Sequence, residues 1–431
     1  MKIRYIIAFV FAFSIGNTFA QSNQPAPNQA KPILLMNGIA HLGNGEVIKN
    51  SAIGFENGKL TMVVDATVAR IDMSKFEVVK IEGQHVYPGF ILPNSELGLR
   101  EVNAVRATVD AREAGDLKPN VRSVIAYNTD SELITTFKHN GILTTQIVPS
   151  GGTISGTSSI VQLDAWNWED AVIKEDDGIH LNWPARKIRP RWWMGETEYQ
   201  VNKEYDNTVA KIQKLFSDAK AYSENNGGKT NIKLEAMLGL YDGSKQLFIH
   251  ENAAKSILES VQFAKNNAVK KIVVVGGRDV SMITEFIKDN DISVVLNGVH
   301  IMPSREESDV DMPYKTPALL QQAGIKFCIA YGGSIMNHRN LPFLAGTAAA
   351  YGLSKEEALK TITSNAAEIL GLANLGVLKE GYRATLFVSE GDALDMRTNN
   401  VIHAFIDGRN VKTDGMQEIL YERYKEKYGQ E

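Results

Sequence analysis

Short apolar runs separated by tight-turn signals mark both ends of the chain. Near the start, the runs between residues 33 and 82 are interrupted by Asn37-Gly38, Gly43-Asn44-Gly45 and Asn57-Gly58. Asn-Gly supplies the positive φ that hairpin turns need, so this region is predicted to be antiparallel β-structure. Near the other end, residues 403–406 meet Asp407-Gly408, a second hairpin signal. The pattern predicts a small composite β-sandwich domain formed by residues 33–85 and 373–431.

The middle of the chain, residues 86–372, alternates strand-like apolar runs with helical stretches. Four consecutive strand–helix units between residues 246 and 351 require right-handed crossovers and a parallel sheet. Earlier runs bring the strand count to eight, at residues 86–92, 124–127, 143–148, 179–182, 247–250, 272–275, 293–296 and 327–331. Eight strands over about 280 residues suit a (β/α)8 barrel, whose typical size is about 250 residues. We therefore predict an α/β fold, a TIM-like barrel inserted in the β-sandwich, with a doubly wound sheet as the alternative.

The first twenty residues have the pattern of a secretory signal peptide. Lys2 and Arg4 precede an apolar run over residues 5–15, and the segment ends in small residues at Ala20. A leader rich in Gln, Pro and Asn follows over residues 21–32. The apolar run is shorter than the about 20 residues of a transmembrane helix, and no later stretch is long enough. We expect a periplasmic or secreted protein without a membrane span.

Composition narrows the possible partners. Without Lys2 and Arg4 the chain keeps 44 of its 46 basic residues against 50 acidic ones, a net charge of −6. Because no dense basic cluster lies on a predicted helix, nucleic acid is not expected as a partner. The single cysteine, Cys328, excludes an internal disulfide and lies in an apolar run, which predicts a buried thiol.

In a (β/α)8 barrel the active site lies at the C-terminal ends of the strands. The segments that follow the predicted strands therefore hold the candidate site residues, at positions 94–96, 148–152, 250–252, 276–279, 297–300 and 331–334. The Gly-rich segment 150–156 lies among them, but it lacks the G-K-[ST] ending and the G-x-G-x-x-G spacing of phosphate-binding loops. Nucleotide binding is therefore not expected.

Four stretches resemble the amidohydrolase superfamily, close to its imidazolonepropionase-like branch. They read V-Y-P-G-F-I-L-P-N-S-E-L-G-L at 86–99, L-F-I-H-E-N-A-A-K at 247–255, N-L-P-F-L-A-G-T-A-A-A-Y-G-L-S-K-E-E-A-L-K-T-I-T-S-N-A-A-E-I-L-G-L at 340–372, and G-V-L-K-E-G-Y-R-A-T-L-F-V at 376–388. Together they span nearly the whole chain after the leader. The resemblance implies a metal-centred barrel with a composite β-domain, and hydrolysis of C–N bonds by metal-activated water.

The same resemblance implies a metal site that this chain keeps only in part. The superfamily's ligands are His-x-His after the first strand, His after the fifth and sixth, and Asp after the eighth. His250 matches the fifth-strand ligand. The other positions, and the one where relatives of this branch often carry a further His, are occupied by Asn94, Glu96, Asn252, Gly276, Gly277, and Gly333 or Ser334. The sequence thus indicates a degenerate metal site.

Two interpretations of the remaining residues stay open. In the first, Glu96, His250 and Asp279 are catalytic and hold one divalent metal such as zinc, which usually has three protein ligands. In the second, which we favour, no metal is bound and Asp279 only caps the following helix. Substrate contacts are expected from Asn94, Asn252, His300 and Ser334. His338 also lies on a loop at the barrel top, whereas His41, His139, His180 and His403 are expected to be structural.

An energy comparison separates the possible functions. Metal coordination activates water by roughly 12 kcal/mol, whereas a carboxylate or histidine acting alone as general base contributes roughly 3 to 5 kcal/mol. Glu96 with His250 cannot replace a metal in amide hydrolysis. The protein is therefore either a hydrolase of non-peptide C–N bonds with a remodelled site, or a non-catalytic pseudoenzyme. A pseudoenzyme would bind a small ligand or pair with an active homologue in a homo- or hetero-oligomer.

Overall fold

A computed structural model describes residues 24–224, 229–303 and 307–430. The predicted signal peptide, residues 1–20, lies outside the described residues. None of the helices in the described segments combines the length and apolar character that a membrane span requires.

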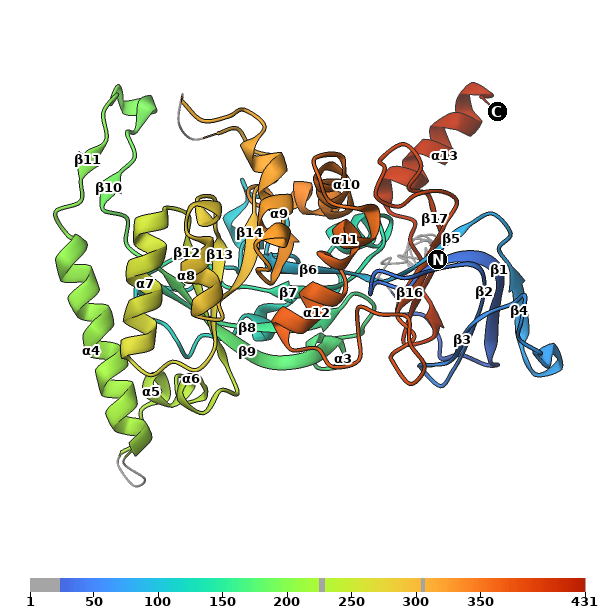
Figure 1. The fold of residues 1–431 in the computed structure, drawn as a ribbon, viewed down its shortest axis with the longest axis horizontal. Helices are drawn as coiled ribbons and strands as arrows, with labels where there is room; N and C mark the ends of the chain where they lie inside the picture. The colour runs from blue at the N-terminus through green and yellow to red at the C-terminus, as the bar shows by residue number, and fades with distance from the viewer. Residues whose placement is uncertain (1–23, 225–228, 304–306, 431) are drawn as a thin grey trace, which may run out of the picture.

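Both ends of the chain form one β-rich domain, at the right of Figure 1. Its strands pair in the order β18-β17-β16-β5-β1-β2-β3, with β4 beside β1. Their bounds are β1 Ile33–His41, β2 Val47–Glu56, β3 Lys59–Asp65, β4 Glu77–Lys80, β5 His85–Pro88, β16 Leu386–Ser389, β17 Val401–Ile406 and β18 Arg409–Asn410. These eight strands form one continuous hydrogen-bonded sheet, built from both ends of the chain as predicted.

The predicted turns explain how this sheet is connected. Asn57 and Gly58, with φ of 49° and 76°, link β2 to β3. Asp407 and Gly408, with φ of 49° and 74°, link β17 to β18 in the same way. Strand β5 pairs with β1 on one side and with β16 on the other. It therefore connects the strands of the N-terminal segment with those of the C-terminal segment.

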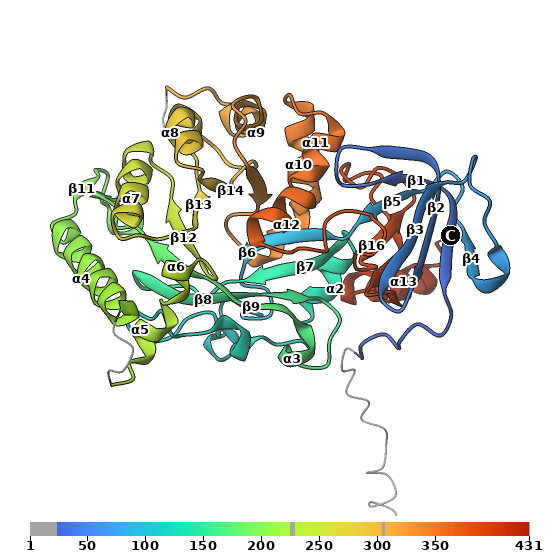
Figure 2. The same cartoon turned by 60° about the horizontal axis from the view of Figure 1, so that its bottom comes forward.

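The middle of the chain forms a second eight-stranded sheet in the order β15-β14-β13-β12-β9-β8-β7-β6 (Figure 2). Its strands are β6 Phe90–Ser95, β7 Ile142–Ile147, β8 Ile154–Gln162, β9 Val172–Asn182, β12 Gln246–Glu251, β13 Ile272–Gly276, β14 Ser293–Asn297 and β15 Phe327–Ala330. The last strand, β15, returns to lie beside β6 and nearly closes the sheet. The predicted α/β barrel with an attached β-rich domain is confirmed.

One barrel strand differs from the prediction in place and direction. The predicted strand at 124–127 is a 3-10 helix, η3 Ser123–Ala126, and the eighth strand is instead β8, which lies between β7 and β9. Strand β8 runs antiparallel to both neighbours, whereas the other neighbouring pairs are parallel. Gly151 and Gly152, with φ of 76° and 77°, reverse the chain before β8. The Gly-rich segment is thus a hairpin connection.

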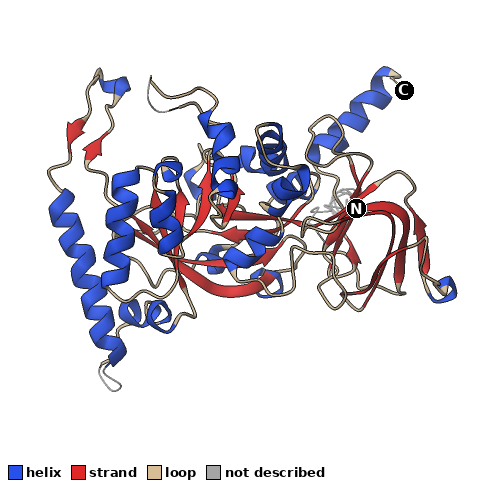
Figure 3. Ribbon diagram, viewed as in Figure 1, coloured by secondary structure: helices blue, strands red, loops and turns tan. Residues whose placement is uncertain are grey.

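Helices cover the outside of the barrel (Figure 3). They are α2 Leu133–Lys138, α3 Trp168–Ala171, α4 Tyr205–Glu224, α5 Ile232–Ala236, α6 Gly239–Asp242, α7 Ala254–Asn266, α8 Thr284–Asp289, α9 Met312–Gln322, α10 Leu341–Ala350, α11 Lys355–Lys360 and α12 Ser364–Leu370. Helix α13 Met416–Tyr428 ends the chain, and the short strands β10 Lys187–Ile188 and β11 Gln200–Val201 form a separate hairpin. The Ser354 side chain accepts a hydrogen bond from the Glu357 amide, which caps α11 as its sequence predicts.

The interior of the barrel is filled with apolar side chains below the strand ends. Phe248 is fully buried there with Ile91, Ile160 and Val295. Cys328 lies in the same cluster as a free and fully buried thiol, and burial raises its pKa. Polar side chains also gather at the C-terminal ends of the parallel strands, above this apolar cluster.

Candidate functional site

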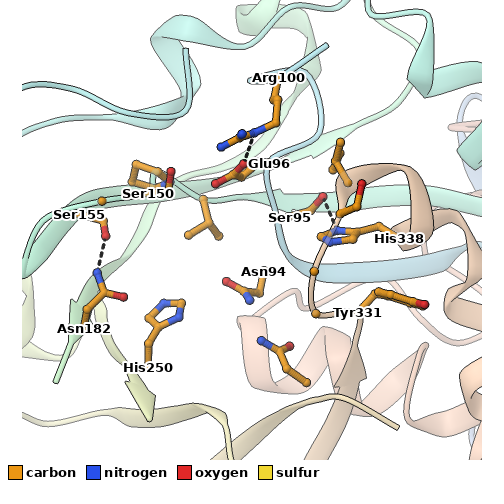
Figure 4. Close-up of a pocket in the computed structure, with 18 of the residues that line it drawn as sticks. Asn94, Ser95, Glu96, Arg100, Ser150, Ser155, Asn182, His250, Tyr331 and His338 are labelled. Carbon is orange, nitrogen blue, oxygen red and sulfur yellow. Dashed lines mark hydrogen bonds and ion pairs between the residues drawn. The ribbon is translucent and has the colours of Figure 1, made fainter. Parts of the chain in front are cut away.

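A cavity of about 380 Å³ opens at the C-terminal ends of the barrel strands. Residues from seven strands, or from the loops that follow them, line it: Asn94, Ser95, Glu96, Arg100, Asn103, Val148, Pro149, Ser150, Gly151, Ser155, Asn182, His250, Asn297, Tyr331, Gly332, Gly333, Ser334, Ile335 and His338. Figure 4 shows Asn94 near the middle, with His250 on one side and His338 on the other. This is the face on which (β/α)8 barrels build their active sites.

Strand β6 brings three consecutive polar side chains to the cavity. Asn94 has a φ of 53°, a left-handed conformation that asparagine tolerates better than most residues. Its amide N–H donates to Gln146 Oε1 at 3.1 Å. Glu96 Oε2 accepts from Arg100 Nε at 2.5 Å, and the buried Ser95 Oγ lies 3.2 Å from His338 Nδ1. The carboxylate of Glu96 is therefore held by a guanidinium on the cavity wall.

His250 ends a chain of hydrogen bonds that runs into the barrel. Its Nε2 lies 2.8 Å from His180 Nδ1, and His180 Nε2 lies 2.9 Å from Ser158 Oγ. Ser158 Oγ donates to Asp177 Oδ1 at 2.6 Å, and Gln146 Nε2 donates to Asp177 Oδ2 at 2.8 Å. Ser158, Asp177 and His180 are buried, so the cavity is connected to an interior carboxylate.

Burial sets the charge states along this chain. It raises the pKa of Asp177 to about 6, although hydrogen bonds from Ser158 and Gln146 act in the opposite direction. Burial lowers the pKa of His250 to about 4 and that of His180 well below its ordinary value. At pH 7 the two imidazoles are therefore neutral, and Asp177 is mostly ionised.

The structure does not bring all the predicted site residues together. Glu96, His250, Asn94 and Ser334 line the same cavity. Asp279 lies beside a neighbouring cavity of about 270 Å³ and forms an ion pair with Arg278 at 2.9 Å. The Asn252 side chain accepts from the Arg278 amide at 3.4 Å, and His300 Nε2 lies 2.7 Å from Thr347 Oγ1. The predicted triad of Glu96, His250 and Asp279 is thus divided between two cavities.

Several residues of the site had no sequence signal that selected them. His180, expected to be structural, contacts His250 directly and stacks on Phe248 with ring centroids 4.7 Å apart. Ser158 lies on β8 and Asp177 lies on β9, and no sequence motif marks either residue. One pattern could have identified His180. It stands two residues from Asn182 in a strand, so the two polar side chains point to the same face of the sheet.

The residues present do not fit the superfamily's metal. A catalytic zinc needs about three protein ligands, and the described parts of the chain contain no group of three His, Cys, Asp or Glu side chains that could hold a metal ion. Glu96 Oε2 is engaged by Arg100, and His250 Nε2 by His180. The two side chains left at ligand positions are therefore bonded to protein partners.

The comparisons with known proteins agree with this fold. Residues 228–411 match the amidohydrolase family. A Thermotoga maritima amidohydrolase structure is similar with a TM-score of 0.78 and 23% identity, covering 88% of this chain and 99% of that one. Comparison with curated protein sequences finds no match.

Other solved structures share the fold at lower similarity. A prolidase complexed with N-methylphosphonate-L-proline has a TM-score of 0.54 at 16% identity, over 88% of this chain and 99% of that one. The ochratoxinase of A. niger has a TM-score of 0.54 at 13% identity, over 90% and 97%. These likenesses show the fold.

Acidification is expected to destabilise the fold through His250 and His338. Burial lowers the pKa of each to about 4, from an ordinary 6.5. The unfolded chain therefore takes up protons below pH 6.5 that the folded chain refuses until about pH 4. Above pH 6.5 the histidines do not lower the stability. As the pH falls from 6.5 to about 4, each histidine lowers the free energy of unfolding by about 1 kcal/mol per pH unit. Asp177, with its raised pKa, contributes a slope of opposite sign between about pH 6 and 3.8.

Urea unfolding between pH 7 and pH 4.5 measures this slope. The variant His338→Gln removes one of the buried histidines, leaving His250 and His180, and is expected to show a shallower decrease than the unmodified protein. An exposed-loop control, Asn44→Ala, leaves the slope unchanged. Equal slopes in the His338→Gln variant and the unmodified protein would show that His338 does not titrate as its burial requires.

Proposed function

We propose that this protein binds a small polar molecule at the mouth of its barrel and does not use metal-activated water. The proposal rests on one observation. The two side chains that remain at the superfamily's metal-ligand positions are bonded to other protein groups. Glu96 is paired with Arg100, and His250 is bonded to His180. The cavity around them retains the size and polar walls of a small-molecule site, since such pockets measure about 300–1,000 Å³.

The energetic comparison supports binding over amide hydrolysis. Without a metal, a histidine or carboxylate base contributes roughly 3 to 5 kcal/mol to lowering the barrier, against roughly 12 kcal/mol from metal activation of water. The resulting deficit of about 7 to 9 kcal/mol corresponds to five or more powers of ten in rate at about 1.4 kcal/mol per tenfold. A member of the superfamily with this site is therefore a non-hydrolytic ligand-binding protein.

Elemental analysis and ligand stabilisation test the proposal together. Protein purified without chelators is expected to contain far less than one transition-metal ion per chain. Small polar compounds that raise its unfolding temperature should do so equally with and without EDTA. A ligand at 100 times its dissociation constant adds about 2.7 kcal/mol to stability, which a thermal scan detects readily. Stoichiometric metal, or stabilisation that EDTA abolishes, would overturn the proposal.

Asn297 offers a variant that locates the bound compound. Its Oδ1 is buried without a hydrogen-bond partner among the described residues, and the residue lines the cavity. Asn297→Ala therefore breaks no internal hydrogen bond of that oxygen, and it removes a polar side chain from the cavity lining. We expect the variant to lose most of the ligand stabilisation, whereas Asn266→Ala, on the outer helix α7, retains it.

A second function is favoured by the chain of hydrogen bonds behind His250. A histidine oriented by a second polar group is the usual arrangement of a general base. Metal-independent hydrolysis of an activated, non-peptide C–N bond by water deprotonated at His250 is the reaction this arrangement could support. Turnover of such a substrate by the unmodified protein, with loss in His250→Ala and no effect of EDTA, would establish this function in place of simple binding.

A further inference from the structure

We infer that His250 is locked in one neutral tautomer, with its Nδ1 presented to the cavity as a hydrogen-bond acceptor that selects an uncharged ligand bearing an N–H or O–H donor. The preference for an uncharged ligand rests on the proposed binding function. The tautomer assignment concerns the protein without ligand and does not depend on that function. It follows from the direction in which each hydrogen bond between Asp177 and His250 must point.

The direction of the hydrogen bonds is determined at Asp177, the buried end of the hydrogen-bonded chain. Ser158 has one hydroxyl hydrogen, and its oxygen lies 2.6 Å from Asp177 Oδ1 and 3.3 Å from the Gly178 carbonyl. A carboxylate oxygen can only accept, so the shorter contact requires that this hydrogen point to Asp177. Ser158 Oγ must then accept from His180, whose Nε2 lies 2.9 Å away. His180 therefore carries its proton on Nε2.

The orientation of Gln146 supports this assignment from the other side. Its Oε1 accepts from the Asn94 backbone N–H, which cannot reverse its role, so its amide nitrogen faces Asp177 Oδ2 at 2.8 Å. Asp177 is thus surrounded by two donors, Gln146 and Ser158. A carboxylate with two donors is the arrangement expected of an ionised group, and an ionised Asp177 accepts at both of its oxygens.

The same logic continues through the two imidazoles. A neutral imidazole has one N–H and one lone pair. Since His180 holds its hydrogen on Nε2, its Nδ1 must accept from His250 Nε2 at 2.8 Å. His250 then has its lone pair on Nδ1. This atom has no hydrogen-bond partner among the described residues, and it is not among the buried polar atoms that lack one, so the cavity reaches it.

The charge and polarity around Nδ1 narrow the ligand class. Glu96, on the cavity wall, is also an acceptor and is paired with Arg100. The amides of Asn94 and Asn297 can turn to donate or accept, so they do not discriminate between ligands. His250 discriminates because its lone pair attracts a donor and repels a carboxylate oxygen. A neutral molecule such as a carboxamide fits this site better than a carboxylate of the same shape.

The tautomer is measured directly by long-range ¹H–¹⁵N correlation spectra of protein labelled with ¹⁵N-histidine at pH 7. His180 and His250 are both expected to show a protonated Nε2 and an unprotonated Nδ1. In Ser158→Ala the acceptor that fixes His180 is removed, so both rings should lose the single-tautomer pattern. Ser159→Ala is the matched control, because Ser159 accepts from the Asp176 amide and takes no part in the chain.

Several outcomes would overturn the inference. A protonated Nδ1 or an imidazolium at His250 in the unmodified protein contradicts the assigned direction outright. An unchanged tautomer in Ser158→Ala would show that the chain to Asp177 does not determine it. The spectrum of the unmodified protein decides the question alone if the Ser158→Ala variant does not fold.

Acetamide and acetate, which have nearly the same shape, test the ligand class. Titrated into the unmodified protein, acetamide is expected to shift the His250 Nδ1 signal, whereas acetate leaves that signal in place. A shift with acetate and none with acetamide would overturn the ligand part of the inference. A correct tautomer with no response to either compound would instead count against binding at the barrel mouth, so the two failures are distinguishable.

Discussion

Replacement of Asp164 by alanine is expected to lower the free energy of unfolding by about 3–5 kcal/mol, the usual effect of breaking a buried ion pair. Asp164 Oδ2 accepts from Arg409 Nη1 at 2.5 Å, and its Oδ1 lies 3.9 Å from Lys138 Nζ. The Asp164 and Lys138 side chains are buried. Without the carboxylate, two cations remain close together in the interior with no counter-charge.

The position of this cluster increases its effect. Arg409 lies on β18 of the β-rich domain, whereas Lys138 ends α2 of the barrel. The Ala26 amide also donates to Asp164 Oδ2 at 3.0 Å, so the segment before β1 depends on the same carboxylate. Burial lowers the pKa of Lys138, and Asp164 is the group that opposes this shift. The substitution therefore loosens three parts of the chain at once.

Guanidinium unfolding followed by circular dichroism measures the loss. Asp164→Asn keeps the shape of the side chain and should lose nearly as much, because the charge is what the two cations require. The control is Asp395→Ala, which breaks an Arg–Asp pair of similar length, 2.7 Å, whose Arg397 is 83% exposed. Exposed pairs contribute little, so a loss in Asp395→Ala equal to that in Asp164→Ala would contradict the role of burial.

Replacement of Phe387 by alanine is expected to cost about 3–5 kcal/mol of stability, as for other buried aromatic residues reduced to alanine. Phe387 is fully buried, stacks on Tyr87 at 5.3 Å and meets the edge of Phe90 at 4.8 Å. A Cβ on Gly141 would lie 2.5 Å from its Cζ, so the ring fills the space above that glycine. The cavity left by alanine therefore opens where strand β16 of the β-rich domain packs on the barrel.

Thermal and guanidinium unfolding of Phe387→Ala and Phe387→Leu test this prediction. Leucine fills part of the space and should lose clearly less than alanine. Because the ring bridges the two domains, we expect each variant to unfold in one transition at a lower midpoint. A Phe387→Ala variant as stable as the unmodified protein would show that the two domains do not depend on this contact.

Much of the architecture could be predicted because it depends on local chemistry. Asn57-Gly58 and Asp407-Gly408 mark hairpins since few other residues adopt positive φ easily, and Ser354 marks a helix start through its own hydroxyl. Strands β12 to β15 are apolar because both faces of a parallel sheet are covered. Strand β8 was not predicted because it contains no long apolar run. Its serines and threonines are buried, and hydrogen bonds to other parts of the chain satisfy their hydroxyl groups.

The candidate site was predictable only in part. The segments that follow the parallel strands could be named, and Asn94, Glu96 and His250 do line one cavity. Asp279 was selected because of its place after a strand, but its side chain turns to Arg278 and a neighbouring cavity. The direction of a side chain at a strand end depends on its tertiary neighbours, so sequence position alone could not decide it.

By itself, the sequence determined a barrel with an added β-rich domain and the absence of the paired histidines after its first strand, since both follow from residue types and their spacing. Only the tertiary structure decided that His180, Ser158 and Asp177 stand behind His250. Those residues come from β8, β9 and β12, and their contacts arise when strands distant in sequence lie side by side. Hydrogen-bond direction is a property of such contacts, which no single segment of the chain contains.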